Sequence, residues 1–183
     1  MIYNLKEQLL GAIHSNFAEK FAYLILDNPE SFPELYALTF DENSKTAWRA
    51  MWVCEKVSYW FPEWFMDKRS ELMQRIIQCT NHGSKRSLLN ILLYLPIEEP
   101  ISVEFLNFCL DHMLSPQEPI AIQALCMKMA YELCKKEPEL LPEFQYILKN
   151  AEPEYYSKGI QTAIRNTLKQ LKQHERTKAR KRE

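Results

Sequence analysis

Glycine is nearly absent from this sequence, with three residues in a chain of 183. A sheet protein of this length would need many more glycines in its turns. Loops that cradle phosphates or dinucleotides also need several glycines close together, and a Gly-x-Ser-x-Gly nucleophile elbow is missing. The scarcity therefore excludes a mostly β fold and these catalytic loops. Residues that lose little rotamer freedom in helices, such as Leu, Ala, Met, Glu, Lys and Gln, dominate instead.

Long apolar runs and paired cysteines are also lacking. No stretch reaches the roughly 18 apolar residues that a membrane span needs. Residues 1–7 show no basic region followed by an apolar core, so we expect no signal peptide. Five irregularly spaced cysteines are typical of free thiols in a reducing compartment rather than of disulfides. We therefore expect a cytoplasmic protein without a membrane span.

The net charge of -1 conceals an asymmetry. Residues 169–183 carry seven basic and two acidic side chains, a net of +5. Subtracting these from the totals of 23 and 24 leaves 16 basic and 22 acidic residues, a net of -6, for the rest. At this length we expect a single domain, over 1–173, followed by a frayed basic tail over 174–183.

Prolines indicate where helices begin. Six Pro-Glu pairs start at Pro29, Pro33, Pro62, Pro138, Pro142 and Pro153. Proline is favoured in the first helical turn because its missing N–H would be unpaired there, and glutamate complements the helix dipole. The pattern predicts ten helices, over 3–14, 16–27, 30–40, 44–60, 62–80, 85–95, 101–114, 119–136, 138–149 and 154–173. We expect caps at Ser15 and Ser44 and a helix-ending turn at Gly83.

The prolines also mark a repeat. Pro29, Pro62, Pro96 and Pro138 lie 33, 34 and 42 residues apart. Apolar residues stand five and eight positions before each proline, on one helix face; they are Leu24, Val57, Ile91 and Leu133, then Phe21, Cys54, Leu88 and Ala130. Short connections make neighbouring helices fold back as hairpins. Hairpins stacked into a solenoid explain this repeat; the alternative is an irregular bundle in which prolines only mark helix starts.

Several segments carry a family resemblance. They are Trp48-Arg49, the run 83–89, the run 115–121 and the turn 137–140. Together they resemble short bacterial HEAT-like proteins whose members often carry the name adenylosuccinate lyase. The resemblance implies an all-α, armadillo-type superhelix of about five hairpins. The lyase loop of Ser-Ser-x-Met-Pro-x-Lys-x-Asn type is missing, since its nearest counterpart, 83–87, lacks Met-Pro, so we do not expect lyase activity.

Two Cys-x-x-His units are candidate metal ligands: Cys79 with His82, and Cys109 with His112. Residues three apart share a helix face, so each unit could offer a thiolate and an imidazole to zinc. Both cysteines also fit apolar helical positions. We interpret the pairs as core thiols with helix-end histidines and expect neither a metal site nor a cofactor.

An aromatic cluster offers a second candidate surface; it consists of Trp48, Trp52, Tyr59, Trp60, Phe61, Trp64 and Phe65. Trp48 and Trp52 lie four apart and should stack, with Arg49 and Lys56 nearby. If exposed, the cluster could hold bases or a partner peptide. Aromatic residues at helical spacing more often form a core, and this is our interpretation.

An enzymatic alternative rests on two of these tryptophans and a nearby aspartate. Trp60, Trp64 and Asp67 are loosely similar to the aromatic and aspartate positions of HEAT-like alkylpurine DNA glycosylases. A DNA groove needs clustered Lys and Arg, whereas the body of this chain is acidic. The basic tail from Lys169 to Arg182 could contact nucleic acid, but a solvated helix end explains it as well.

We therefore expect a non-catalytic interaction module that binds a protein partner through the curved surface of a helical repeat. If the second helix of each hairpin lines that surface, eight residues are candidate contacts. They are Tyr36, Lys68, Arg69, Glu71, Arg75, Asn107, Asp111 and His112.

Overall fold

The computed structural model describes residues 4–11 and 16–180, and these residues form helices joined by short turns, with no strand among them. The chain divides into two compact units, Met1–Pro96 and Ile97–Glu183. We call them the N-terminal unit and the C-terminal unit and describe each by itself. None of the described helices is both long and apolar enough to cross a membrane.

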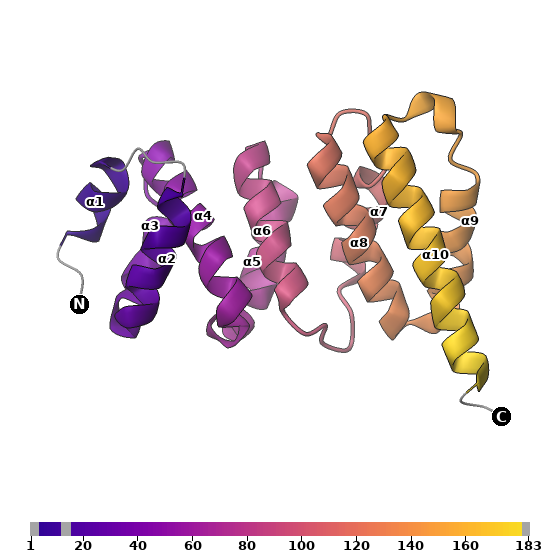
Figure 1. The fold of residues 1–183 in the computed structure, drawn as a ribbon, viewed down its shortest axis with the longest axis horizontal. Coiled ribbons are helices and arrows are strands. Elements are labelled where there is room, and N and C mark those ends of the chain that lie inside the picture. The colour runs from indigo at the N-terminus through magenta and orange to yellow at the C-terminus, as the bar shows by residue number, and fades with distance from the viewer. Residues whose placement is uncertain (1–3, 12–15, 181–183) are drawn as a thin grey trace. The chain divides into compact units, whose positions relative to one another are not determined.

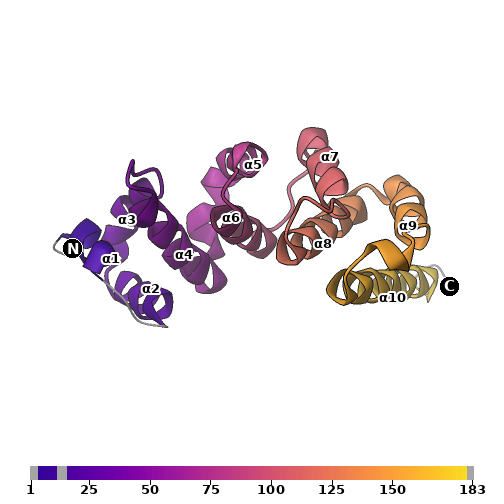
Figure 2. The same cartoon turned by 90° about the horizontal axis from the view of Figure 1, so that it is seen from above.

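The N-terminal unit is arranged around α4. Its elements are α1 (Leu5–Gly11), α2 (Phe17–Asp27), η1 (Pro29–Ser31), α3 (Phe32–Leu38), α4 (Ser44–Trp60), η2 (Pro62–Lys68), α5 (Arg69–Gln78) and α6 (His82–Tyr94), where η denotes a 3₁₀ helix. Helix α4 packs against α2 on one side and α6 on the other, and it also contacts α1 and α3 (Figures 1 and 2). The helices of this unit therefore follow one another side by side.

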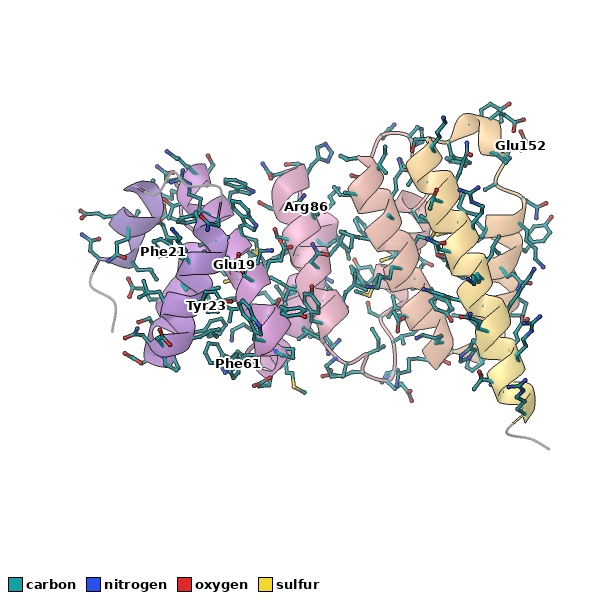
Figure 3. All side chains as sticks on the ribbon, viewed as in Figure 1. Glu19, Phe21, Tyr23, Phe61, Arg86 and Glu152 are labelled. Carbon is teal, nitrogen blue, oxygen red and sulfur yellow. The ribbon has the colours of Figure 1, made fainter. Side chains whose placement is uncertain are left out.

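Apolar residues on several faces of α4 explain its central place. Ala50, Met51, Val53, Cys54 and Val57 are all buried. Residues three and four apart form an apolar stripe along one side of a helix. Adjacent buried residues make this stripe wide enough for α4 to contact more than one neighbouring helix. On α2, Glu19 and Tyr23 lie one turn apart, and both are exposed (Figure 3).

The C-terminal unit repeats this plan around α8. Its elements are α7 (Val103–His112), α8 (Ile120–Lys136), η3 (Pro138–Leu140), α9 (Leu141–Lys149), η4 (Pro153–Tyr155) and α10 (Lys158–Arg180). Helix α8 packs against α7, α9 and α10 (Figure 2). Buried positions on α10 recur every three or four residues, at Ile160, Ile164, Thr167 and Leu171, so one face of this helix covers α8.

Most of the expected helix starts agree with the structure, but α6 begins at His82 rather than at 85, and α10 begins at Lys158 rather than at 154. Pro29, Pro62, Pro138 and Pro153 open short 3₁₀ helices, and the first three of these run directly into α3, α5 and α9. Pro96, by contrast, lies in the connection after α6 and opens no helix. Most of the repeat positions that precede the prolines are buried, but Phe21 and Leu24 on α2 are half-buried.

Of the three predicted helix-end residues, Ser44 and Gly83 were assigned wrongly, and Ser15 cannot be compared with the structure. The cap of α4 is Asn43, not Ser44, because the Asn43 side chain accepts hydrogen bonds from the N–H groups of Lys45 and Thr46. Gly83 does not end a helix: Asn81 caps α6, and Gly83 lies in the first turn of that helix. Ser15 lies outside the described residues.

Helix α10 also continues beyond its predicted end at 173, to Arg180. Residues 172–180 are mostly strong helix formers, and the basic ones favour the negative end of the helix dipole. Leu171 is the last buried residue that the described part of α10 contributes. The division into a 1–173 domain and a 174–183 tail stays a prediction.

Gly83 is required for close packing rather than for backbone freedom. The indole of Trp48, which stacks on Trp52 with ring centroids 5.4 Å apart, approaches so closely that a Cβ on Gly83 would lie 2.8 Å from Trp48 Nε1. The predicted stacking of the two tryptophans is confirmed. A methyl group at residue 83 would force the indole to move.

We expect Gly83→Ala to lower the free energy of unfolding by about 1 kcal/mol, although alanine in a helix normally raises it by a similar amount. In a Trp48→Ala background the same change should be stabilising, by about 0.5 to 1 kcal/mol. Urea unfolding of the four proteins of this cycle measures the difference. An equal effect of Gly83→Ala in both backgrounds would contradict the packing argument.

Candidate functional site

The eight candidate contact residues fall into two groups, one in each unit. Tyr36, Lys68, Arg69, Glu71 and Arg75 belong to α3, η2 and α5 in the N-terminal unit. Asn107, Asp111 and His112 belong to α7 in the C-terminal unit. Each group is described by its own contacts.

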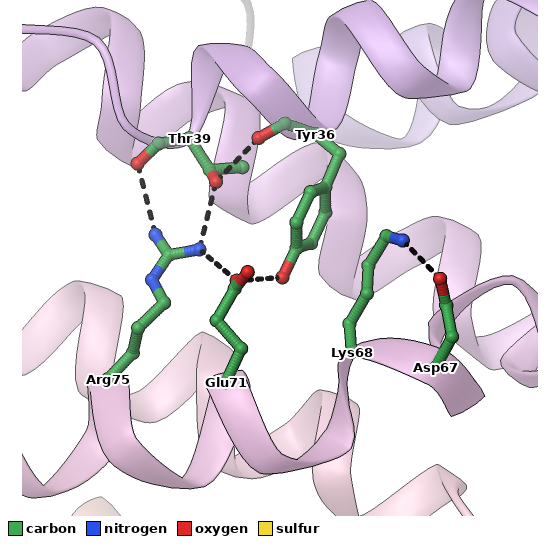
Figure 4. A network of polar contacts seen from close by, with 6 residues as sticks. All are labelled: Tyr36, Thr39, Asp67, Lys68, Glu71 and Arg75. Atoms are coloured by element: carbon green, nitrogen blue, oxygen red, sulfur yellow. Dashed lines mark hydrogen bonds and ion pairs between the residues drawn. The ribbon is translucent and has the colours of Figure 1, made fainter.

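The group in the N-terminal unit forms a polar network between α3 and α5 (Figure 4). Tyr36 donates its hydroxyl hydrogen to Glu71 Oε1 at 2.5 Å. Arg75 donates from Nη1 to Thr39 Oγ1 at 3.0 Å and from Nη2 to the Thr39 carbonyl at 3.1 Å. The Arg75 guanidinium also lies over the Phe40 ring, 3.8 Å from its centroid. These contacts join the end of α3 to α5.

Lys68 and Arg69 lie beside this network. The Lys68 ammonium donates to Asp67 Oδ2 at 2.9 Å and lies 5.0 Å from the centre of the Tyr36 ring. Arg69 is buried, with 7% of its surface exposed. The network thus has an intramolecular role that the sequence did not indicate, and contact of these residues with a partner stays a prediction.

The environment of Tyr36 changes its acidity. Burial first, and then the hydrogen bond to the Glu71 carboxylate, raise the pKa of Tyr36 well above its ordinary value of 10.0. Because the folded state prefers the neutral phenol, the stability that Tyr36 contributes is complete below pH 10 and is lost as the pH rises beyond it.

The group on α7 is more exposed. Asn107 and Asp111 lie one turn apart and are both exposed. The His112 ring stacks on Phe108 with centroids 4.0 Å apart, and its Nδ1 lies 2.8 Å from the Phe108 carbonyl oxygen. His112 Nε2 lies 3.7 Å from the buried carboxylate of Glu118. His112 is therefore held by its own helix and by the turn before α8.

Asn107 also lines a groove that was missed in the sequence. The groove has a volume of about 420 Å³ and lies between α7, the end of α8, η3 and α9. Its lining is formed by Pro100, Ile101, Val103, Leu106, Asn107, Leu110, Cys134, Glu137, Glu139, Leu140, Glu143, Phe144 and Ile147. The sequence does contain a hint of this groove, because three glutamates are interspersed with apolar residues between 137 and 147. That these residues lie close to α7 could be known only from the fold.

The aromatic cluster does not form the expected core. Phe65 is buried, but the exposed fractions of Trp48, Tyr59, Trp60 and Phe61 are 37%, 62%, 36% and 37%. Trp52 and Trp64 are half-buried. Consecutive aromatic residues at the junction of α4 and η2 point in different directions, so neighbouring helices cover only part of them.

The two Cys-x-x-His units differ in geometry. Cys79 lies beyond the end of α5 in extended backbone, where its thiol donates to the Asn81 carbonyl at 3.3 Å. The premise that Cys79 and His82 share a helix face is therefore wrong. Cys109 does lie on a helix with His112, but it is fully buried, and burial raises its pKa well above the usual range, as does the neighbouring thiol of Cys126.

The residues of the DNA-repair alternative are divided between two surfaces. Trp64 and Asp67 line a shallow pocket of about 410 Å³ together with Glu63 and Lys68. Trp60 lines a different pocket, with Glu55. The first pocket has two carboxylates and one cation, and the ammonium of Lys68 holds the pKa of Asp67 below its usual range. This lining repels phosphate more than it attracts it.

We expect Tyr36→Phe to lower the free energy of unfolding by about 1 to 2 kcal/mol near neutral pH, since Glu71 loses a short hydrogen bond. The difference from the unaltered protein should shrink as the pH rises above 10, where only the unaltered protein loses the contribution of a neutral Tyr36. Urea unfolding between pH 8 and 11 measures both effects. Parallel pH profiles for the two proteins would refute this assignment.

Comparison with known proteins completes the description of the chain. A family model described as a HEAT repeat domain matches residues 5–171, which include α1 to α9 and most of α10. Comparison with curated proteins and with solved structures gave no match. The match covers nearly the whole chain and agrees with the succession of packed helices in each unit. The chain belongs to the HEAT repeat family.

Proposed function

We propose that this HEAT repeat protein is a non-catalytic interaction module that binds a short segment of a protein partner in the groove between α7 and α9. The observation that carries the proposal is the composition of this groove, which is apolar inside and acidic at its edge. HEAT repeats commonly mediate protein interactions, and this groove supplies a surface suited to that role.

The interior of the groove can receive an apolar side chain. Leu106, Cys134 and Phe144 are buried beneath it, whereas Val103 at its edge has 66% of its surface exposed. The volume of about 420 Å³ lies within the range of roughly 300 to 1,000 Å³ found for ligand pockets. Covering the exposed apolar lining would remove it from water and favour association.

The charges around the groove select the partner. Glu137, Glu139 and Glu143 line it, and no Lys or Arg belongs to its lining. Glu139 and Glu143 are exposed. An acidic partner would therefore be repelled, and a segment with a large apolar residue flanked by Lys or Arg would complement both features.

Two of the predicted contact residues agree with this location. Asn107 lines the groove and can accept or donate a hydrogen bond to the backbone of a bound segment. Asp111 lies one turn further along α7, exposed, and would extend the acidic edge. A cytoplasmic location is part of this proposal, supported by the four cysteines that lie buried as free thiols.

Lyase activity and DNA repair are not part of the proposal. The loop that carries lyase chemistry in the enzymes of that name is missing from the sequence. The pocket that holds Trp64 and Asp67 has a single cation, Lys68, where a DNA-binding surface needs clustered Lys and Arg.

The groove can be tested by selecting peptides from a random display library with the purified protein. We expect the selected peptides to share a large apolar residue flanked by Lys or Arg. Glu139→Lys combined with Glu143→Lys should weaken their binding at least about tenfold, since attraction becomes repulsion. Isothermal titration calorimetry measures the affinities, which should also fall as salt is added.

The matched control is Glu152→Lys combined with Glu154→Lys. These two glutamates are exposed in the same unit, and Glu154 likewise lies in the first turn of a 3₁₀ helix, η4. The control variant should bind the selected peptides as the unaltered protein does. Equal weakening by both pairs of changes, or selection of acidic peptides, would rule out the groove as the binding site.

A further inference from the structure

A second pocket lies in the N-terminal unit, between α2, α4 and α6. It has a volume of about 340 Å³ and is lined by Glu19, Glu55, Lys56, Tyr59, Trp60 and Tyr94. We call it the aromatic pocket. Its aromatic side chains are unusually open to solvent, with 62% of Tyr59 and 43% of Tyr94 exposed.

The rings of this pocket stand at steep angles to one another. Tyr59 and Trp60 have centroids 5.7 Å apart and an interplanar angle of 79°. Tyr59 and Tyr94 have centroids 5.5 Å apart and an angle of 81°. Tyr23 packs on Trp60 at 5.1 Å and supports its position. Nearly perpendicular rings form a corner in which a bound group can contact more than one ring.

Two carboxylates complete the pocket. Glu55 is held in place by hydrogen bonds from the Ser87 hydroxyl to Oε2 at 2.5 Å and from Asn90 Nδ2 to Oε1 at 2.9 Å. Glu55 and Tyr94 line the same pocket, and burial, followed by the negative charge of Glu55, raises the pKa of Tyr94. Glu19 is exposed on α2, one turn before Tyr23 (Figure 3).

We propose that the aromatic pocket binds an alkylated ammonium group, carried by a lysine side chain of a protein partner. The negative faces of Tyr and Trp rings attract a cation, and recognition of quaternary ammonium groups by such rings is well established. Alkylation lowers the cost of removing the ammonium from water, while the positive charge remains to interact with Glu19 and Glu55. The open side at Tyr59 favours the end of a long side chain over a small free molecule.

Lys56 opposes a cation and so offers a direct test of charge. Lys56 belongs to the lining of the pocket, and its positive charge offsets that of one of the two carboxylates. Removing this charge strengthens the binding of a cation and weakens the binding of an anion or a nucleotide. Whether Lys56→Gln raises or lowers the affinity therefore distinguishes a cationic ligand from an anionic one.

The test uses three short peptides that are identical except at one position, which holds trimethyllysine, lysine or the uncharged carbon isostere of trimethyllysine. Binding to the full chain is followed by NMR chemical-shift titration. We expect saturable binding of the trimethyllysine peptide at about 1 mM or below, and affinities at least about fivefold weaker for the other two peptides. Equal affinity for the uncharged isostere, or no saturation, overturns the proposal.

Variants locate the binding. Tyr59→Leu and Glu19→Gln should each lower the affinity for the trimethyllysine peptide at least about threefold. Lys56→Gln should raise this affinity about twofold or more. Tyr146→Leu is the matched control, because Tyr146 is a comparably exposed tyrosine, at 69%, on α9 of the C-terminal unit. An effect of Tyr146→Leu as large as that of Tyr59→Leu, or weakening by Lys56→Gln, contradicts the assignment.

Two further experiments complete the test. One distinguishes this site from a pocket for a small free cation, and the other distinguishes it from the groove of the C-terminal unit. Tetramethylammonium chloride should compete only at concentrations well above those of the peptide; equal potency would overturn the claim that a protein side chain carries the cation. Repeating the titration with the groove variant, Glu139→Lys with Glu143→Lys, should leave the affinity unchanged. The proposal rests on the proposed interaction function only in taking a protein as the partner, so failure at one site is distinguishable from failure at the other.

Discussion

Each unit depends on covering a long helix that carries apolar residues on more than one side. Helices α4 and α8 are both 17 residues long, and each buries side chains against two or more neighbours. A fully buried Val, Leu or Met side chain contributes about 1.5 to 3 kcal/mol, so leaving either flank uncovered would cost more than a small unit can spare. Helices α2 and α6 cover α4, and α7, α9 and α10 cover α8. This requirement forces the side-by-side succession that defines the fold.

The same constraint decides where surfaces suited to binding lie. Helices that cover α4 and α8 leave grooves near the turns between them, and the binding surfaces that we propose lie at these grooves. Glu139 and Glu143 illustrate this. They lie in the first turns of η3 and α9, where carboxylates favour the positive end of the helix dipole, and the same position places them at the edge of an apolar groove.

The aromatic run around the end of α4 shows the limit of coverage. Adjacent residues on a helix point about 100° apart, so consecutive aromatic residues cannot all face the same neighbour. Phe65 reaches the core, whereas Tyr59 and Trp60 remain at the surface beside Tyr94 of α6. These exposed rings and the anchored carboxylate of Glu55 are the basis of the ligand site that we propose in this unit.

Signals that act within one or two turns could be read from the sequence, because their physics is local. The Pro-Glu pairs mark helix starts since proline lacks an N–H and glutamate favours the helix dipole, and the stripe of Cys54 and Val57 reflects burial on one face. The cap of α4 is also local, but Asn43 and Ser44 are adjacent residues of equally suitable type, so the pattern did not separate them. The space that Trp48 needs at Gly83, the hydrogen bond between Tyr36 and Glu71, and both pockets could not be read in this way. They depend on contacts between helices that lie far apart in the sequence. Only the packing of α4 and α8 against their partners settles those choices, because contact between distant segments depends on the distances and angles between whole helices.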